Sequence, residues 1–294
     1  MDWFGVDYFS IFVPKDYKSY FSFLKVFIVC NPKLHPMAKI KRLFFDIETS
    51  YCTGWFWRPS FKTSISYEQV LENAKIICIC YKWEGSNKIH HIKWDKGNDK
   101  AMIGDFIKVL MSADEIVGHN SDKFDLKWVR TRFLVHGGKS LPDFKSIDTL
   151  KISRSKFNFP SNRLDAIGKY LGFGGKADTG GIQLWHDIIQ RNSSKAITKM
   201  IDYCKRDVDL LEKVYLKMEG FAKPKTHIGV EFGNDKCSCP KCGSDNTYFN
   251  KRTVSASGTI KVDMKCNSCN KYFNTSLKAY NDRCAERRAE KDRG

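Results

Sequence analysis

The sequence predicts an α/β domain followed by a small cysteine-rich module that binds a metal. Three apolar segments of strand length come first, and segments with helical spacing follow them. Two C-x-x-C pairs lie in the last quarter of the chain. With 294 residues, of which 42% are hydrophobic and 14% aromatic, the chain can form a real core, which argues against wholesale disorder.

The charge balance favours a polyanionic partner. Lys and Arg number 50 and Asp and Glu 33, which gives a formal net charge of +17 and points to nucleic acid or an anionic membrane surface. The longest apolar stretches, such as residues 21–30 with Lys25 inside, are far shorter than the roughly 20 residues of a membrane-spanning helix. We therefore expect a soluble protein that binds nucleic acid and has no membrane partner.

Cysteine usage indicates a reducing compartment, which we take to be the cytoplasm. The chain has 11 cysteines, an odd number, and no segment has the pattern of a signal peptide. Five of the cysteines cluster between Cys237 and Cys269. Such a cluster is more typical of a metal site than of a disulfide framework.

The α/β pattern extends from residue 43 to about residue 220. Residues 43–47, 75–83 and 88–94 have the character of three strands in a meander. We expect further strands at 115–117 and 146–152, and helices at 100–111, 124–134, 164–171 and 196–218. In the glycine-rich loop 172–181, Lys176 is a weak candidate for a phosphate contact, and a plain connector is the alternative.

Composition divides the chain into five parts. Residues 1–36 are an aromatic-rich extension of uncertain status: Met37 resembles a fresh protein start, and an extra element packed on the core is an equal alternative. We expect the α/β domain at 37–220, a linker at 221–236 and the metal module at 237–276. Residues 277–294 form a charged tail that we expect to be a frayed helix or disordered.

Asp46 and Glu48 are the first candidate site residues. They lie two positions apart in an apolar strand, so their carboxylates project from the same face. Two neighbouring acids repel each other, and a divalent cation such as Mg²⁺ or Mn²⁺ is the usual compensation.

Two further motifs follow in the chain. In the first, a strand ends near Asn120 and a helix begins around Phe124 and Asp125. In the second, Tyr203 and Asp207 are four residues apart and share one face of a helix that packs on the core. Each motif by itself is common on protein surfaces, but their occurrence together in this order favours a functional site.

The three motifs together resemble those of the DEDD superfamily of 3′→5′ exonucleases, in its tyrosine subclass. The likeness is to the proofreading domains of B-family DNA polymerases and their stand-alone relatives, and it covers about residues 40–218. It implies an RNase H-like mixed sheet flanked by helices. It also suggests a bacterial or phage-like context. No polymerase domain follows in this chain.

The resemblance also assigns roles to residues of this sequence. Two divalent cations, Mg²⁺ or Mn²⁺, would be held by the four acids, and Tyr203 would orient the attacking water. The catalytic and metal-binding acids would be Asp46, Glu48, Asp125 and Asp207, with Asn120 and Phe124 as substrate-binding residues. Asp148 belongs to a recurring segment to which we assign a supporting role. Three other acids are expected on solvated surface: Asp122, Asp202 and Asp209.

An aromatic segment follows the first strand. Residues 51–67 contain several Trp, Phe and Tyr side chains that could stack on unpaired bases, with Arg58 and Lys62 near phosphates. A hydrophobic flap over the core is an equal alternative.

The cysteine pairs have the spacing of a structural zinc site. Cys239 and Cys242 form one C-x-x-C pair, and Cys266 and Cys269 form the other after 23 intervening residues. Strand-like segments between them give the module the character of a zinc ribbon, for which one Zn²⁺ would supply much of the folding free energy. Cys237 is a fifth cysteine, which we rank below Cys239 as a ligand. The basic ribbon could bind nucleic acid or protein.

The predicted function is a two-metal-ion 3′→5′ exonuclease, with single-stranded DNA favoured over RNA as substrate. Two alternatives stay open from the sequence: an exonuclease of the same fold that acts on RNA, and an adaptor that binds nucleic acid without cleaving it.

Overall fold

The structure, a computed structural model, describes residues 40–58, 64–174 and 181–293. The aromatic-rich extension, Lys62 and Lys176 lie outside these residues. The chain divides into two compact units: Lys39–His227 forms one, and Ile228–Gly294 belongs to the other.

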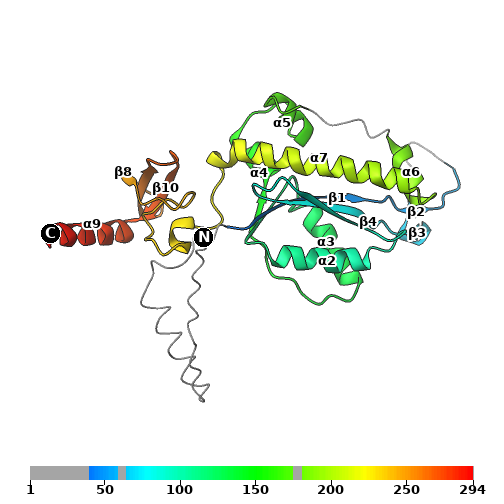
Figure 1. Cartoon of the computed structure of the whole chain (residues 1–294), viewed down its shortest axis with the longest axis horizontal. Helices are drawn as coiled ribbons and strands as arrows, with labels where there is room; N and C mark the ends of the chain where they lie inside the picture. Colours follow the sequence, from blue (N-terminus) through cyan, green and yellow to red (C-terminus); the bar gives the residue numbers. More distant parts are fainter. Residues whose placement is uncertain (1–39, 59–63, 175–180, 294) are drawn as a thin grey trace, which may run out of the picture. The chain divides into compact units, whose positions relative to one another are not determined.

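The first unit is built on a mixed five-stranded sheet (Figure 1). Its order is β5-β4-β1-β6-β7, with β1 (Arg42–Thr49), β4 (Ile76–Trp83), β5 (Ile89–Lys93), β6 (Glu115–Gly118) and β7 (Ser146–Asp148). The predicted meander is confirmed, since β1, β4 and β5 are antiparallel. The parallel pairs β1–β6 and β6–β7 complete the sheet.

Helices cover both faces of this sheet (Figure 1). α2 (Lys100–Met111) and α3 (Asp125–Val135) lie on one face, and α7 (Ser194–Met218) runs along the other with α5 (Leu164–Tyr170) and α6 (Ile182–Ile189) beside it. α7 begins where the Ser193 side chain accepts a hydrogen bond from the Ala196 N–H over 3.2 Å. Its apolar stripe is buried, which fixes the opposite stripe at the surface.

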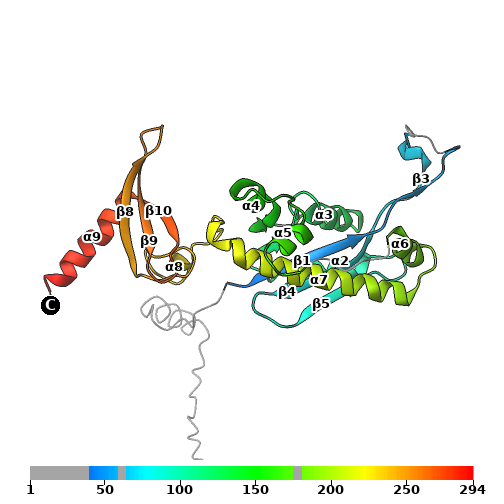
Figure 2. The same cartoon turned by 90° about the horizontal axis from the view of Figure 1, so that it is seen from above.

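The structure differs from the sequence prediction at residues 146–152. Only Ser146–Asp148 is a strand, and Thr149–Lys156 forms the helix α4. The Asp148 carboxylate ends the strand because it caps the helix, accepting a hydrogen bond from the Leu150 N–H over 3.0 Å. Two short strands, β2 (Thr53–Gly54) and β3 (Val70–Glu72), extend beyond the end of β1, as Figure 2 shows.

The second unit contains a three-stranded antiparallel sheet. β8 (Thr247–Val254), β9 (Ile260–Cys266) and β10 (Tyr272–Ser276) are arranged in the order β10-β9-β8. Cys237, Val262 and Met264 form its small core. The short helix α8 (Ile228–Glu231) precedes the sheet, within the residues predicted as a linker.

Of the two alternatives expected for the charged tail, a frayed helix or disorder, the structure shows a helix, α9 (Leu277–Lys291). The Ser276 side chain caps α9, accepting a hydrogen bond from the Ala279 N–H over 3.2 Å. Among the helices of the described residues, none combines the length and the apolar character that crossing a lipid bilayer requires.

Candidate active site and zinc centre

The two acids of β1 lie on the face of the sheet that α7 covers. Asp46 is paired with Cys80 of β4, and Glu48 with Cys78. The Cys204 Sγ on α7 donates to the Asp46 carbonyl oxygen over 3.4 Å and approaches its Oδ2 at 3.7 Å. The contact brings one helical turn of α7 directly onto the acidic stretch of β1.

Asp207 completes a group of three carboxylates. It follows Cys204 by three residues on α7 and is only 6% exposed. Carboxylate oxygens of Asp46, Glu48 and Asp207 all lie within 4.8 Å of one another. Oxygen ligands at this separation suit a hard divalent cation, which would also offset the repulsion among three anions.

Asp125 lies next to the same stretch of β1, although it is outside the group of three. It is the first residue of α3 and is 4% exposed. Its Oδ1 accepts a hydrogen bond from the Ile47 N–H, between the two acids of β1, over 3.3 Å. Burial raises the pKa of Asp125 to about 7, and the nearby charge of Asp148 acts in the same direction.

The loop before α3 positions the two predicted substrate-binding residues. Asn120 adopts a left-handed conformation with φ of 65°, and its N–H donates to Oδ1 of Asp148 over 2.9 Å. The Asn120 carbonyl accepts a hydrogen bond from the Phe124 N–H over 3.0 Å. Phe124 is 40% exposed and meets Trp128 edge to face. Asp148 therefore supports this loop, in line with the supporting role expected of it.

The remaining acids near the motifs pair with lysines. Asp202 is exposed and its carboxylate lies 4.0 Å from Lys205. Two others are partly buried rather than solvated, in contrast to the expectation: Asp122 pairs with Lys151 at 2.6 Å, and Asp209 with Lys82 at 3.1 Å and Lys213 at 2.7 Å.

Sequence reasoning missed three buried cysteines beside the acids: Cys78, Cys80 and Cys204. Burial raises the pKa of Cys204 well above its ordinary value, so this thiol adds no negative charge beside Asp46. Cys78 and Cys80 are two positions apart, as Asp46 and Glu48 are. This spacing could have indicated that both cysteines project from one face of their strand.

The described aromatic side chains of the segment after β1 are largely exposed. Trp57 is 92% exposed, Trp55 is 48% exposed, and the two rings meet edge to face at 6.2 Å. Among the described residues of the segment, these side chains therefore do not form the hydrophobic flap that the sequence left open. Base stacking stays a prediction.

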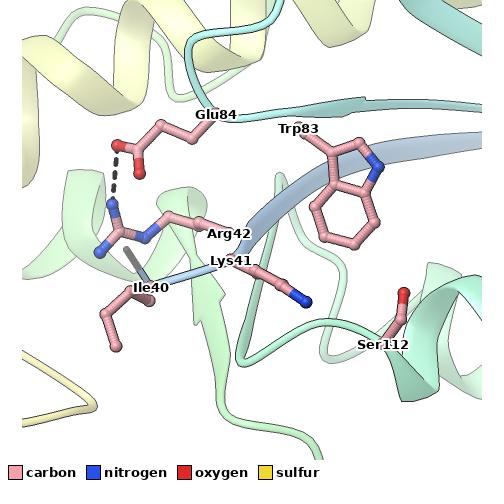
Figure 3. A pocket seen from close by; sticks show the side chains of 6 residues that line it. All are labelled: Ile40, Lys41, Arg42, Trp83, Glu84 and Ser112. Atoms are coloured by element: carbon pink, nitrogen blue, oxygen red, sulfur yellow. Dashed lines mark hydrogen bonds and ion pairs between the residues drawn. The ribbon is translucent and has the colours of Figure 1, made fainter. Parts of the chain in front are cut away.

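A pocket of about 350 Å³ lies at the start of β1, and none of the three clustered acids is among the residues that line it (Figure 3). Arg42 in its wall forms ion pairs with Glu84 at 2.8 Å and Glu115 at 2.9 Å. Glu84, the acid among the residues that line the pocket, is therefore already paired with Arg42. The carboxylate cluster, rather than this cavity, defines the candidate active site.

The second unit brings the four predicted zinc ligands together. Sγ atoms of Cys239, Cys242, Cys266 and Cys269 all lie within 4.8 Å of one another. Two pairs, Cys239–Cys269 and Cys242–Cys266, are 3.6 Å apart, close to the roughly 3.8 Å edge of a tetrahedron with Zn–S bonds of about 2.3 Å. Cys237 lies outside this group, with its Sγ 4.0 Å from the Thr275 hydroxyl. This arrangement fits the predicted zinc ribbon.

Comparisons with known proteins identify the first unit. No curated protein matches the chain. Among solved structures, the family B DNA polymerase from the hyperthermophilic archaeon Pyrobaculum calidifontis is similar, with a TM-score of 0.47 and 16% identity. That match covers 66% of this chain and 26% of the polymerase chain, so this chain spans about a quarter of the polymerase. A family model described as RNase_H superfamily matches residues 43–219, and the chain therefore belongs to the RNase H superfamily.

Proposed function

We propose that the chain is a 3′→5′ exonuclease that hydrolyses phosphodiester bonds in single-stranded DNA with the help of two divalent cations. One observation carries the proposal: carboxylate oxygens of Asp46, Glu48 and Asp207 converge within 4.8 Å, and Asp125 hydrogen-bonds to the backbone between the first two. Membership of the RNase H superfamily supports a nuclease with this arrangement.

The four acids fit Mg²⁺ or Mn²⁺ by the chemistry of their donors. All are carboxylates, three lie within mutual reach of one ion, and the fourth is buried next to them. When bound, a pair of such cations activates the attacking water and stabilises charge on the phosphoryl group. The four acids would hold these ions, Asp46 and Glu48 from β1, Asp125 from α3 and Asp207 from α7.

Tyr203 has a positioning role in this proposal. It precedes Asp207 by one helical turn and so lies on the same face of α7 as the acid. A tyrosine hydroxyl is a hydrogen-bonding group and a poor base, so Tyr203 would orient the attacking water rather than take its proton.

The substrate end lies against the loop before α3. Phe124 offers a half-exposed ring on which an unpaired terminal base can stack. Asn120 presents its side chain from a backbone that the Asp148 carboxylate holds in the left-handed conformation. Stacking of this kind favours a single strand, and the net charge of +17 favours its phosphates.

The second unit is proposed to bind one structural Zn²⁺ through its four clustered thiols. Because the ribbon has a small core, the zinc would supply much of its folding free energy. We further propose that the protein works in a reducing compartment, where these thiols stay available to the metal.

End-labelled oligonucleotides test the function directly. Single-stranded DNA and RNA of one sequence are incubated with and without Mg²⁺ or Mn²⁺, and each is also supplied with a blocked 3′ or 5′ end. We expect metal-dependent shortening of DNA that the 3′ block slows and the 5′ block does not. Digestion of RNA faster than DNA would identify RNA as the substrate. Cleavage that neither block slows would indicate an endonuclease, and binding without any cleavage would indicate an adaptor.

A further inference from the structure

The outward face of the ribbon sheet carries a row of three side chains from three different strands. Tyr248 of β8 is paired with Lys265 of β9, and Lys265 is paired with Tyr272 of β10. Residues directly opposite each other in an antiparallel sheet project from the same face. The row is therefore continuous across the whole width of the sheet.

This face is exposed, and the other face forms the core. Val262, Met264 and Cys266 alternate with the outward residues of β9 and are at most 2% exposed. In the row, Tyr248 is 41% and Tyr272 is 56% exposed. The two tyrosine rings are thus available to a partner without unfolding the ribbon.

Lys265 is held between the two rings. Its Nζ lies 5.3 Å from the centre of the Tyr272 ring, a cation–π contact. Hydrogen bonding to the Tyr272 hydroxyl raises the pKa of Lys265, so the side chain stays charged at neutral pH. Neighbouring strands are about 4.8 Å apart, which places the tyrosines about 10 Å apart with a cation between them.

The rest of the outward face is also basic. The next cross-strand row contains Lys251 opposite Asp263, with Asn274 beyond it, and Lys261 follows along β9. Lys251 and Asp263 are 4.0 Å apart. Lys251, Lys261 and Lys265 thus outnumber the one acid, Asp263, in this part of the face, which makes it complementary to a polyanion.

We propose that this face binds single-stranded nucleic acid, with unpaired bases stacked on Tyr248 and Tyr272 and a phosphate held by Lys265. Exposed aromatic rings interleaved with cations are what a single strand requires, since each unpaired base has a free π-face and each linkage a negative charge. A duplex offers the phosphates but keeps its base faces covered. The inference rests on the proposal that the chain acts on nucleic acid, and it does not depend on cleavage.

Binding is measured by fluorescence anisotropy of a 5′-labelled oligothymidylate, with the full chain carrying Asp207→Ala so that the probe is not digested. We expect Tyr248→Ala and Tyr272→Ala each to weaken binding about tenfold. Tyr248→Phe and Tyr272→Phe should stay within about threefold, since the ring is retained. The affinity of a duplex probe should change much less than that of the single strand.

Lys265→Ala separates the phosphate contact from stacking. The slope of log affinity against log salt should become shallower by about 0.7 for this variant, and the tyrosine variants should leave the slope unchanged. Two controls should behave like the unsubstituted ribbon: Phe249→Ala, which removes an aromatic ring from the other face of β8, and Lys291→Ala, which removes one charge from the end of α9. Zinc content shows that each variant keeps a folded ribbon.

Unchanged binding by the doubly substituted Tyr248→Ala, Tyr272→Ala chain with full zinc content would overturn the inference. Equal losses for single strand and duplex would also overturn it, because they would exclude stacking. Neither result bears on cleavage by the first unit. Conversely, a chain that binds through the tyrosines and never cleaves would refute the exonuclease and leave the binding face intact.

Discussion

The backbone N–H of Ile47 donates a hydrogen bond of 3.3 Å to Oδ1 of Asp125, across 78 positions of sequence. Ile47 separates Asp46 from Glu48, so this bond ties the start of α3 to the acidic stretch of β1. The Cys204 thiol ties α7 to the same stretch from the helix side. α3 and α7, which carry the second and third motifs, thereby both contact β1, which carries the first.

Loss of a single acid should abolish cleavage without unfolding the protein. Asp46→Ala and Asp207→Ala each remove one of three converging carboxylates, which also relieves repulsion in the metal-free protein. We expect no detectable turnover and an unchanged or slightly raised melting temperature. Single-turnover cleavage and calorimetry measure the two effects.

Asp202→Ala is the matched control, because Asp202 lies on the same helix but is exposed and close to Lys205. It should retain activity. Tyr203→Phe should lose only part of the rate, within or below the roughly 10²–10⁴ of a positioned proton-transfer group. Equal defects in Tyr203→Phe and Asp207→Ala would contradict the role of Tyr203 in orienting water.

Zinc binding should require the four clustered cysteines and should not require Cys237. Cys239→Ser or Cys266→Ser should release the metal and unfold the ribbon, because one thiolate of four is lost from a site that stabilises the whole module. Cys237→Ser should retain one zinc per chain, since Cys237 lies outside the cluster. Elemental analysis decides the question, and a zinc-free Cys237→Ser chain would show that this cysteine is a ligand.

Arg283 should anchor α9 to the ribbon. Its buried guanidinium donates to Asp235 over 2.6 Å, to the Cys237 carbonyl over 3.0 Å and to the Thr247 hydroxyl over 2.8 Å, and it also pairs with Asp245. Arg283→Ala should cost about 3 kcal/mol of ribbon stability, because it breaks charged hydrogen bonds and leaves buried acceptors unpaired. Arg288→Ala, exposed on the same helix, should change stability by less than about 0.5 kcal/mol. Denaturation followed by tyrosine fluorescence compares the two, and similar losses would argue against the anchor.

Asp99 should stabilise the first unit through a buried ion cluster. Its carboxylate accepts hydrogen bonds from Arg132 over 2.7 and 2.8 Å, from the Ile76 N–H over 3.2 Å, and lies 2.7 Å from Nε2 of His136. Asp99→Asn should cost about 3–5 kcal/mol, because the Arg132 charge stays buried without its partner. The exposed Asp105–Lys108 pair on α2 provides the control, and Asp105→Asn should cost at most about 1 kcal/mol.

The same cluster gives a direction for the pH dependence. Burial by itself raises the pKa of Asp99, but hydrogen bonds from Arg132, His136 and the Ile76 N–H outweigh it and hold the pKa below its ordinary 3.8. The stability from ionised Asp99 is therefore complete above pH 3.8 and is lost as the pH falls through the lowered value. The gap in melting temperature between wild type and Asp99→Asn should narrow in that acidic range, and a constant gap would contradict the assignment.

The sequence by itself determined the features that depend on local spacing. Asp46 and Glu48 share a face because strand side chains alternate, and Tyr203 and Asp207 share one because helix neighbours recur every three to four residues. The C-x-x-C pairs likewise carry their ligand geometry within a few residues. For the same reason the meander and the long helix α7 were predictable from apolar periodicity.

Only the tertiary structure decided which distant side chains meet. Asp99 and Arg132 are 33 positions apart, and nothing in their neighbourhoods marks them as partners. The buried Arg283 lies in a charged segment that was expected to be a frayed helix or disordered. Residues at these distances are brought together by packing of the core, which local propensity does not encode.

The row on the ribbon shows the physical reason most directly. Tyr248, Lys265 and Tyr272 align because of the register of three strands, and β8 carries an irregularity between Phe249 and Lys251 that resets its pairing with β9. A shift of one residue would turn Tyr248 toward the core and Phe249 outward. The alternation of side chains along each strand could be predicted from the sequence. Which of the two alternating sets faces outward depends on the register, which is fixed only by pairing between the strands of the folded sheet.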